Sequence, residues 1–180
     1  MLLAGDPQRR FIEEMVPHHE DAVAMADLAL TRAEHPELTA LATAIKATQT
    51  EEIDQMRAWY RAWFGADVPP GHMGAGRGFA GRGPTGMTGM MGGPTGPMGM
   101  TGGPIGMMGR QDPAALAQAQ PFDKAFIEQM APHHQMAVML SAMALPGAQR
   151  PELIALLQSI VAGQSAEIRQ MRAWFEAWYG

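Results

Sequence analysis

Residues 11–30 read FIEEMVPHHEDAVAMADLAL, and residues 126–145 read FIEQMAPHHQMAVMLSAMAL. The two stretches align at a constant offset of 115, and the alignment continues without a gap to residues 65 and 180. Of the 55 aligned positions, 30 are identical. Apolar residues recur in both stretches at steps of three and four, which is the pattern of an amphipathic helix. The chain is therefore predicted to contain two copies of one helical unit.

Each copy is predicted to be a helical hairpin. In the first copy, Asp6 and Pro7 supply an N-cap and a first-turn proline for a helix over residues 7–33. Pro36 begins a second amphipathic helix, and this helix ends at Gly65 because glycine is the residue that most readily terminates a helix.

Proline residues leave some of the helix boundaries open. Pro17 and Pro132 fall inside periodic segments, where a proline either bends a continuous helix or begins a new one. The apolar residues upstream favour the bend. In the second copy we expect Asp123 to cap the first helix, Pro146 to end it and Pro151 to begin the next.

A glycine-rich segment separates the two copies. Of the 21 glycines, 16 lie between Gly71 and Gly109, in Gly-X-Y triplets interrupted by an extra glycine. The interruptions exclude a collagen triple helix and indicate a flexible crossover. The predicted organisation is a hairpin over 6–65, a Gly/Pro/Met-rich flexible linker over 66–121 and a hairpin over 122–180. The predicted fold is all-α, a ferritin-like four-helix bundle of two repeated hairpins joined by a long disordered Gly/Met-rich crossover.

Composition excludes several classes of protein. The net charge is −5 and the 13 basic residues are dispersed, so nucleic acid is not an expected partner. No apolar run approaches the roughly 20 residues that span a bilayer, so the chain is not expected to be transmembrane. Cysteine is absent and methionine numbers 17. Soft metal ligation would therefore fall to thioethers, which fits an oxidising compartment.

Both copies also keep polar residues that an apolar stripe does not need. Counting outward from the hairpin turn places His19 level with Gln49 and Glu52, and the same count applies in the second copy. Adjacent histidines diverge by about 100° on a helix, so we expect His19 and His134 to point inward and their neighbours to lie at the flank. The polar and thioether residues shared by the copies are Met15, His18, His19, Gln49, Glu52 and Met56, and Met130, His133, His134, Gln164, Glu167 and Met171.

Imidazole, carboxylate and thioether together favour a copper site, for Cu(I), Cu(II) or both, with another transition metal left open. The alternative is that each buried histidine is a core group satisfied by its glutamate. Three further methionines of the second copy are better explained as core filler than as extra ligands: Met136, Met139 and Met143. The linker methionines are either low-complexity drift or a mobile Cu(I) collector: Met87, Met90, Met91, Met98, Met100, Met107 and Met108, beside His72 and Met73.

The motifs MVPHHEDAVAMA (15–26) and MAPHHQMAVML (130–140), each followed by [H/R]-P-E-L and Q-x-x-E-I-x-x-M-x-x-W, resemble the bacterial domain of unknown function 305 family. The resemblance covers both helical copies and leaves out the linker. It implies a ferritin-like fold, a periplasmic or secreted location and, for some members, copper binding and resistance. It also implies the twelve site residues given above. His35 becomes Arg150 in the second copy, which argues against a symmetric role for His35.

Three functions are compatible with the sequence. The first is a copper-binding protein that sequesters the ion or passes it on without catalysis. The second is a ferritin-like metal-dependent redox enzyme, but its di-iron form needs Glu-x-x-His, and here Met15 and Met130 precede His18 and His133 by three residues. The third is a structural or partner-binding bundle. A metal ion is the expected partner, no protein partner is indicated, and a homo-oligomer is compatible with the pattern.

Overall fold

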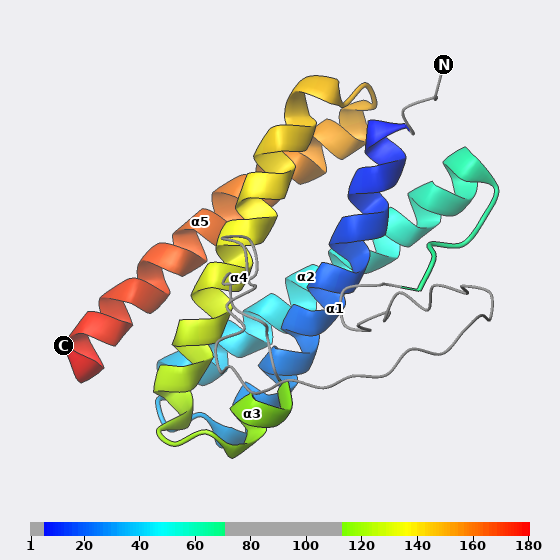
Figure 1. Ribbon diagram of the computed structural model, residues 1–180. Coiled ribbons are helices and arrows are strands. Elements are labelled where there is room, and N and C mark those ends of the chain that lie inside the picture. The colour runs from blue at the N-terminus through cyan, green and yellow to red at the C-terminus, as the bar shows by residue number, and fades with distance from the viewer. Residues whose placement is uncertain (1–5, 71–112) are drawn as a thin grey trace, which may run out of the picture.

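The computed structural model describes residues 6–70 and 113–180, and all regular structure in these ranges is helical (Figure 1). The elements are α1 (Pro7–Arg32), α2 (Pro36–Phe64), α3 (Pro113–Gln118), α4 (Phe122–Ala144), the 3-10 turn η1 (Leu145–Gly147) and α5 (Pro151–Tyr179). The all-α prediction is confirmed. The glycine-rich crossover and its methionines lie outside the described residues.

The helix ends of the first hairpin follow local sequence chemistry. Asp6 caps α1 by accepting a hydrogen bond from the backbone N of Gln8 at 2.9 Å, and Pro7 occupies the first turn. Gly65 ends α2 with a φ of +65°, a left-handed conformation in which a side chain would be strained. α1 and α4 both continue through their internal prolines, so neither helix begins at Pro17 or Pro132.

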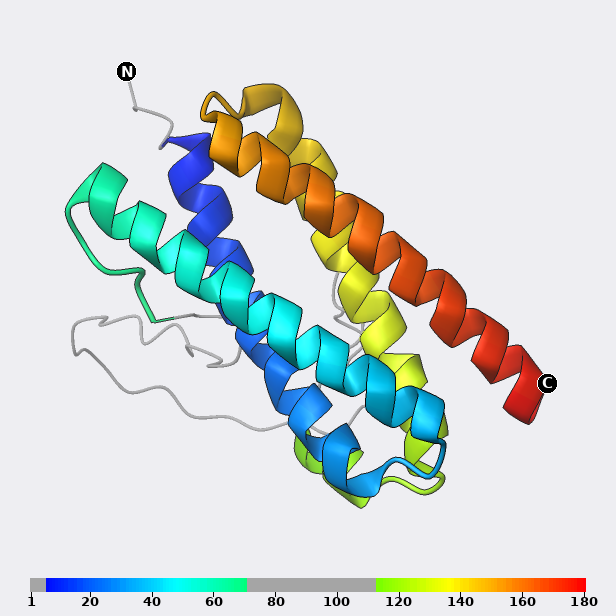
Figure 2. The same cartoon turned by 180° about the vertical axis from the view of Figure 1, so that it is seen from behind.

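The long helices pack as two hairpins, α1 with α2 and α4 with α5, and the hairpins meet where α1 faces α4 (Figures 1 and 2). Buried apolar side chains form two clusters. One contains Ala26, Leu38 and Phe126, and the other contains Ile12 and Leu157. Each cluster draws on α1, α2, α4 and α5, so the hairpins share their core.

The short helix α3 departs from the prediction, which places residues 113–118 in the flexible linker. Leu116 is fully buried and belongs to the same apolar cluster as Phe122 and Phe126. A helix of six residues has little stability of its own. It forms here because Leu116 packs on α4, and this contact is not visible in the local sequence.

The prediction that Asp123 caps α4 is wrong. The N-cap position is Pro121, and Asp123 lies in the first turn with its side chain almost fully buried. Its carboxylate accepts hydrogen bonds from the backbone N of Glu34 at 3.0 Å, the backbone N of His35 at 2.9 Å and His35 Nδ1 at 2.7 Å. Asp123 therefore binds the turn before α2 across the hairpin interface, and its own helix has no side-chain cap.

Gln8 makes the corresponding contact at the opposite end of the molecule. It lies 115 residues before Asp123, and its side-chain Oε1 accepts hydrogen bonds from the backbone N of Gln149 and of Arg150, both at 3.2 Å. Each hairpin thus holds the turn of the other hairpin. The two contacts differ in charge, because one acceptor is a carboxylate and the other is a neutral amide.

Aromatic contacts reinforce both of these turns. The His35 ring stacks on Trp178, with centroids 3.7 Å apart and planes 6° from parallel. At the other end, the Arg150 guanidinium lies 4.2 Å from the centroid of the Trp63 ring. His35 and Arg150 lie 115 positions apart, which is the offset between the two aligned stretches. Both place a planar group over a tryptophan.

Candidate metal site

A band of buried polar side chains crosses the middle of the molecule. Along each of the four long helices it separates the residues of one apolar cluster from those of the other. Burying a polar group without a hydrogen-bonding partner is costly, so polar side chains gathered at one level are expected to bind each other or a ligand. The fully or almost fully buried members of the band are His18, His19, Gln49, Glu52, His133, His134 and Gln164.

Two histidines of the band face carboxylates within their own hairpins. His19 Nε2 donates to Glu52 Oε2 at 2.8 Å, and both groups are buried. His134 Nε2 approaches Glu167 Oε2 to 2.7 Å, but the angle is not that of a hydrogen bond. The levels predicted by counting from the turns are therefore correct, because antiparallel helices of equal rise keep the two residues at one height.

The other two histidines meet each other. The rings of His18 and His133 lie 3.7 Å apart with a tilt of 34°, and both are buried. The expectation that these residues lie at the flank is wrong. α1 faces both α2 and α4, so two positions that diverge by about 100° both point into the interior.

Burial keeps this histidine pair neutral. The pKa of His18 is lowered to about 3, chiefly because burial disfavours its charged form and secondly because His19 and His134 are close; a backbone contact with His133 acts in the opposite direction. The pKa of His133 is also well below its ordinary value, again through burial first and then through His18 and the other two histidines. Both rings are unprotonated at neutral pH.

Many nitrogen and oxygen atoms in the band have no hydrogen-bonding partner in the described protein. The Nδ1 atoms of His18, His19, His133 and His134 all belong to this set. So do both side-chain amide atoms of Gln49 and the Oε1 atom of Gln164. Buried polar atoms are almost always paired in native proteins, so a concentration of unpaired ones in one layer indicates a site that a ligand completes.

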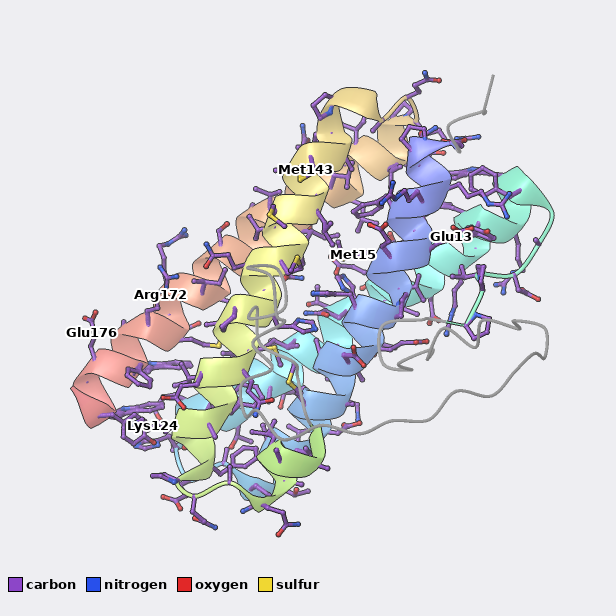
Figure 3. The ribbon with its side chains drawn as sticks, in the orientation of Figure 1. Glu13, Met15, Lys124, Met143, Arg172 and Glu176 are labelled. Carbon is purple, nitrogen blue, oxygen red and sulfur yellow. The ribbon has the colours of Figure 1, made fainter. Side chains whose placement is uncertain are left out.

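The four candidate thioethers border the band. Met15 and Met56 are fully buried in one apolar cluster, and Met130 and Met171 are fully buried in the other. Figure 3 labels Met15 where α1 faces α4. In the described ranges, no three His, Asp or Glu side chains are gathered so that they could hold an ion as they stand. The imidazoles are thus close together without forming a closed coordination shell.

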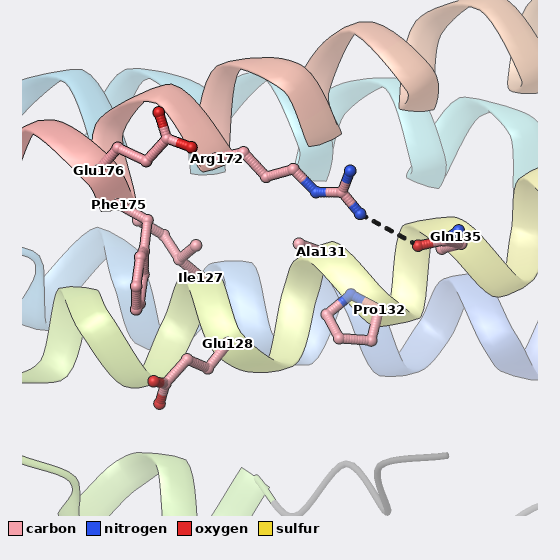
Figure 4. Close-up of a pocket in the computed structure, with 8 residues that line it drawn as sticks. All are labelled: Ile127, Glu128, Ala131, Pro132, Gln135, Arg172, Phe175 and Glu176. Carbon is pink, nitrogen blue, oxygen red and sulfur yellow. Dashed lines mark hydrogen bonds between the residues drawn. The ribbon is translucent and has the colours of Figure 1, made fainter. Parts of the chain in front are cut away.

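A surface groove of about 270 Å³ lies between α4 and α5, apart from the buried band (Figure 4). Within it, Arg172 Nη2 donates to Gln135 Oε1 at 3.3 Å. The equivalent arginine of the first hairpin, Arg57, is paired with the carboxylate of Glu20 instead. None of the residues that line the groove belongs to the predicted metal site: Ile127, Glu128, Ala131, Pro132, Gln135, Arg172, Phe175 and Glu176.

The family model described as domain of unknown function (DUF305) matches residues 8–175, which includes all four long helices almost entirely. The chain belongs to the DUF305 family. The chain has no significant match among curated proteins. In the part of this DUF305 chain that the structure describes, no helix is both long and apolar enough to cross a membrane.

Solved structures similar to this DUF305 chain include two forms of CopM. CopM in the Cu(I)-bound form is 39% identical, with a TM-score of 0.73 and coverage of 96% of this chain and 98% of that chain. CopM in the Cu(II)-bound form is 44% identical, with a TM-score of 0.74 and coverage of 96% and 97%. A DUF305 fragment from Deinococcus radiodurans is 26% identical, with a TM-score of 0.67 and coverage of 95% and 96%.

Proposed function

We propose that this protein binds copper in its buried histidine band and sequesters the ion or passes it on, without catalysing a reaction. The observation that carries the proposal is that the Nδ1 atoms of all four band histidines are buried without a hydrogen-bonding partner. A neutral imidazole nitrogen with a free lone pair is a ligand for both Cu(I) and Cu(II).

The pairing of His19 with Glu52 fits a metal ligand. The carboxylate can only accept, so it fixes the proton of His19 on Nε2 and leaves the lone pair on Nδ1. Metal-binding histidines commonly have their second ring nitrogen held by a carboxylate in this way. Glu167 lies beside His134, with Oε2 at 2.7 Å from Nε2, but without hydrogen-bond geometry. We assign the two glutamates the role of orienting the imidazoles.

The adjacent rings of His18 and His133 would bring both hairpins to one ion. Copper binding competes with protonation, and the lowered pKa values keep these rings in the binding form at neutral and mildly acidic pH. A bound ion would need the two rings to turn away from each other. Gln49, Gln164 and the four bordering methionines would complete the coordination, with the thioethers favouring Cu(I).

The similarity to CopM over almost the whole chain supports copper as the ion, because CopM was solved with both Cu(I) and Cu(II). We further propose that residues 6–65 and 122–180 form one ferritin-like bundle of two repeated hairpins, with 66–121 as a mostly flexible crossover. A periplasmic or secreted location and Cu(I) collection by the linker methionines belong to the same proposal.

The test is a Cu(II) titration of two double variants, one with His18→Ala and His133→Ala and the other with His19→Ala and His134→Ala. Each is expected to weaken tight Cu(II) binding at least about 100-fold, because loss of a ligand exceeds the effect of losing an orienting group. His35→Gln is the matched control, since His35 lies at the turn, stacked on a tryptophan, and should leave affinity unchanged.

Circular dichroism must show that each double variant is folded, because removal of a buried imidazole also destabilises the metal-free protein. If either folded double variant binds Cu(II) as tightly as the unaltered chain, its histidines are packing residues. Equal affinity in both would overturn the proposal and favour the structural bundle.

A further inference from the structure

The outward surface of α4 carries large apolar side chains in water. Met143 is 71% exposed and Met139 is 42% exposed, and among the described residues these are the exposed large hydrophobic side chains. Met136 is half-buried on the same helix. Figure 3 shows Met143 near the C-terminal end of α4. The prediction that these three methionines fill the core is wrong for Met139 and Met143.

The three methionines form one stripe, which we call the α4 methionine stripe. Their spacing of three and four residues confines Met136, Met139 and Met143 to an arc of about 60° around the helix, with neighbours one turn apart. Measured from His134, this arc is centred about 170° away around the same helix. The stripe therefore faces away from the buried histidine band.

The fold does not require methionine at these positions. The equivalent residues of the first hairpin are Asp21 and Ala24, which are exposed, and Leu28, which is partly buried against an apolar cluster. An exposed methionine keeps a flexible side chain with three rotatable bonds and an accessible, polarisable sulfur. Three methionines along one stripe place three thioethers within reach of one another.

The surroundings of the stripe favour a soft, singly charged ion. α4 has no Asp, Glu, Lys or Arg from Gln129 to Ala144, so its own surface there offers no carboxylate for a hard cation and no positive charge to repel an ion. Hard divalent cations need oxygen ligands, whereas thioethers select Cu(I). Three neutral sulfurs match the chemistry of that ion.

We propose that Met136, Met139 and Met143 form a solvent-accessible Cu(I) site on the outer face of α4, separate from the histidine band. The inference extends the proposed copper function, but it uses none of the residues of the buried site. An ion in the band is enclosed by four helices, whereas an ion on the stripe is open to solvent and to a donor or acceptor of copper. The stripe is thus suited to exchange of the ion, and the band to its retention.

The test is the number of Cu(I) ions bound per chain, measured without oxygen by competition with a chromogenic chelator. The variant M136L/M139L/M143L keeps size and hydrophobicity and removes only the sulfurs. It is expected to bind one Cu(I) fewer than the unaltered chain while its Cu(II) affinity is unchanged. Since both proteins contain the linker methionines, the difference isolates the stripe. An unchanged Cu(I) count would overturn the proposal.

A transplanted stripe provides the converse test. The variant D21M/A24M/L28M places thioethers at the equivalent positions of α1 and is expected to bind one additional Cu(I). If it gains none, helical spacing of thioethers does not create the site and the argument fails. The double variant with His18→Ala and His133→Ala separates the two proposals. If M136L/M139L/M143L lowers the Cu(I) count of this double variant by one, the stripe binds Cu(I) even if the band binds no copper.

Discussion

Replacement of Asp123 by alanine is the sharpest test of how the two hairpins are held together. The buried carboxylate accepts hydrogen bonds from two backbone amides and one imidazole at the start of the other hairpin's second helix. Alanine removes all three acceptor contacts at once. It leaves the helix propensity of the first turn of α4 no worse, because alanine is the best helix former.

The expected destabilisation depends on how many hydrogen-bond donors lose their acceptor and on how exposed those donors are to water. A hydrogen bond to a charged group contributes about 1.5–3 kcal/mol when its partners are buried. Here His35 is one-third exposed, so water can replace part of what its two donors lose. We therefore expect Asp123→Ala to lower the free energy of unfolding by about 3 kcal/mol in total, well below the sum of three buried bonds. For a chain of this length that corresponds to about 6–12 °C in Tm.

Urea unfolding of metal-free protein, followed by circular dichroism, measures this loss. Gln8→Ala is the matched control, since it removes the equivalent contact at the other end, with two neutral hydrogen bonds of 3.2 Å each. It should cost about 1–2 kcal/mol. Metal must be absent, because a bound ion stabilises the folded state and would mask the difference.

The reasoning would be refuted if Asp123→Ala were no more destabilising than Gln8→Ala. That result would mean that the carboxylate charge contributes nothing at this interface. The loss of stability in Asp123→Asn should lie between those of Asp123→Ala and Gln8→Ala, because asparagine keeps one acceptor oxygen and loses the charge.

Two further predictions concern acid stability and the linker. Metal-free protein should lose stability as pH falls below about 6.5, because His18 and His133 take up protons only in the unfolded chain. The folded pKa of His18 is about 3, so over this range each histidine lowers the free energy of unfolding by up to about 1.4 kcal/mol per pH unit. Urea unfolding from pH 7 to 4.5 measures this slope, which should shrink in the double variant His18→Ala/His133→Ala. Replacement of Gly71–Gly109 by a Gly/Ser chain of equal length should barely move helicity or the thermal midpoint, because the buried clusters lie in the helices; a large drop would show that the segment packs on them.

The sequence by itself determined the four long helices and the pairing within each hairpin. Proline and glycine mark the helix ends, so the turn of each hairpin can be located from the sequence. Helices have a fixed rise per residue, and counting from the turn therefore placed His19 opposite Glu52 without any tertiary information.

The tertiary structure alone decided how one hairpin lies on the other. Three contacts join segments from different hairpins or from the linker: the contact between His18 and His133, the hydrogen bonds of Asp123 to the turn before α2, and the burial of Leu116. The exposure of Met143 also depends on which face of α4 is left uncovered. Local periodicity shows that a helix has an apolar face, but the crossing of two hairpins is set by the packing of many side chains at once, and no short stretch of sequence encodes that.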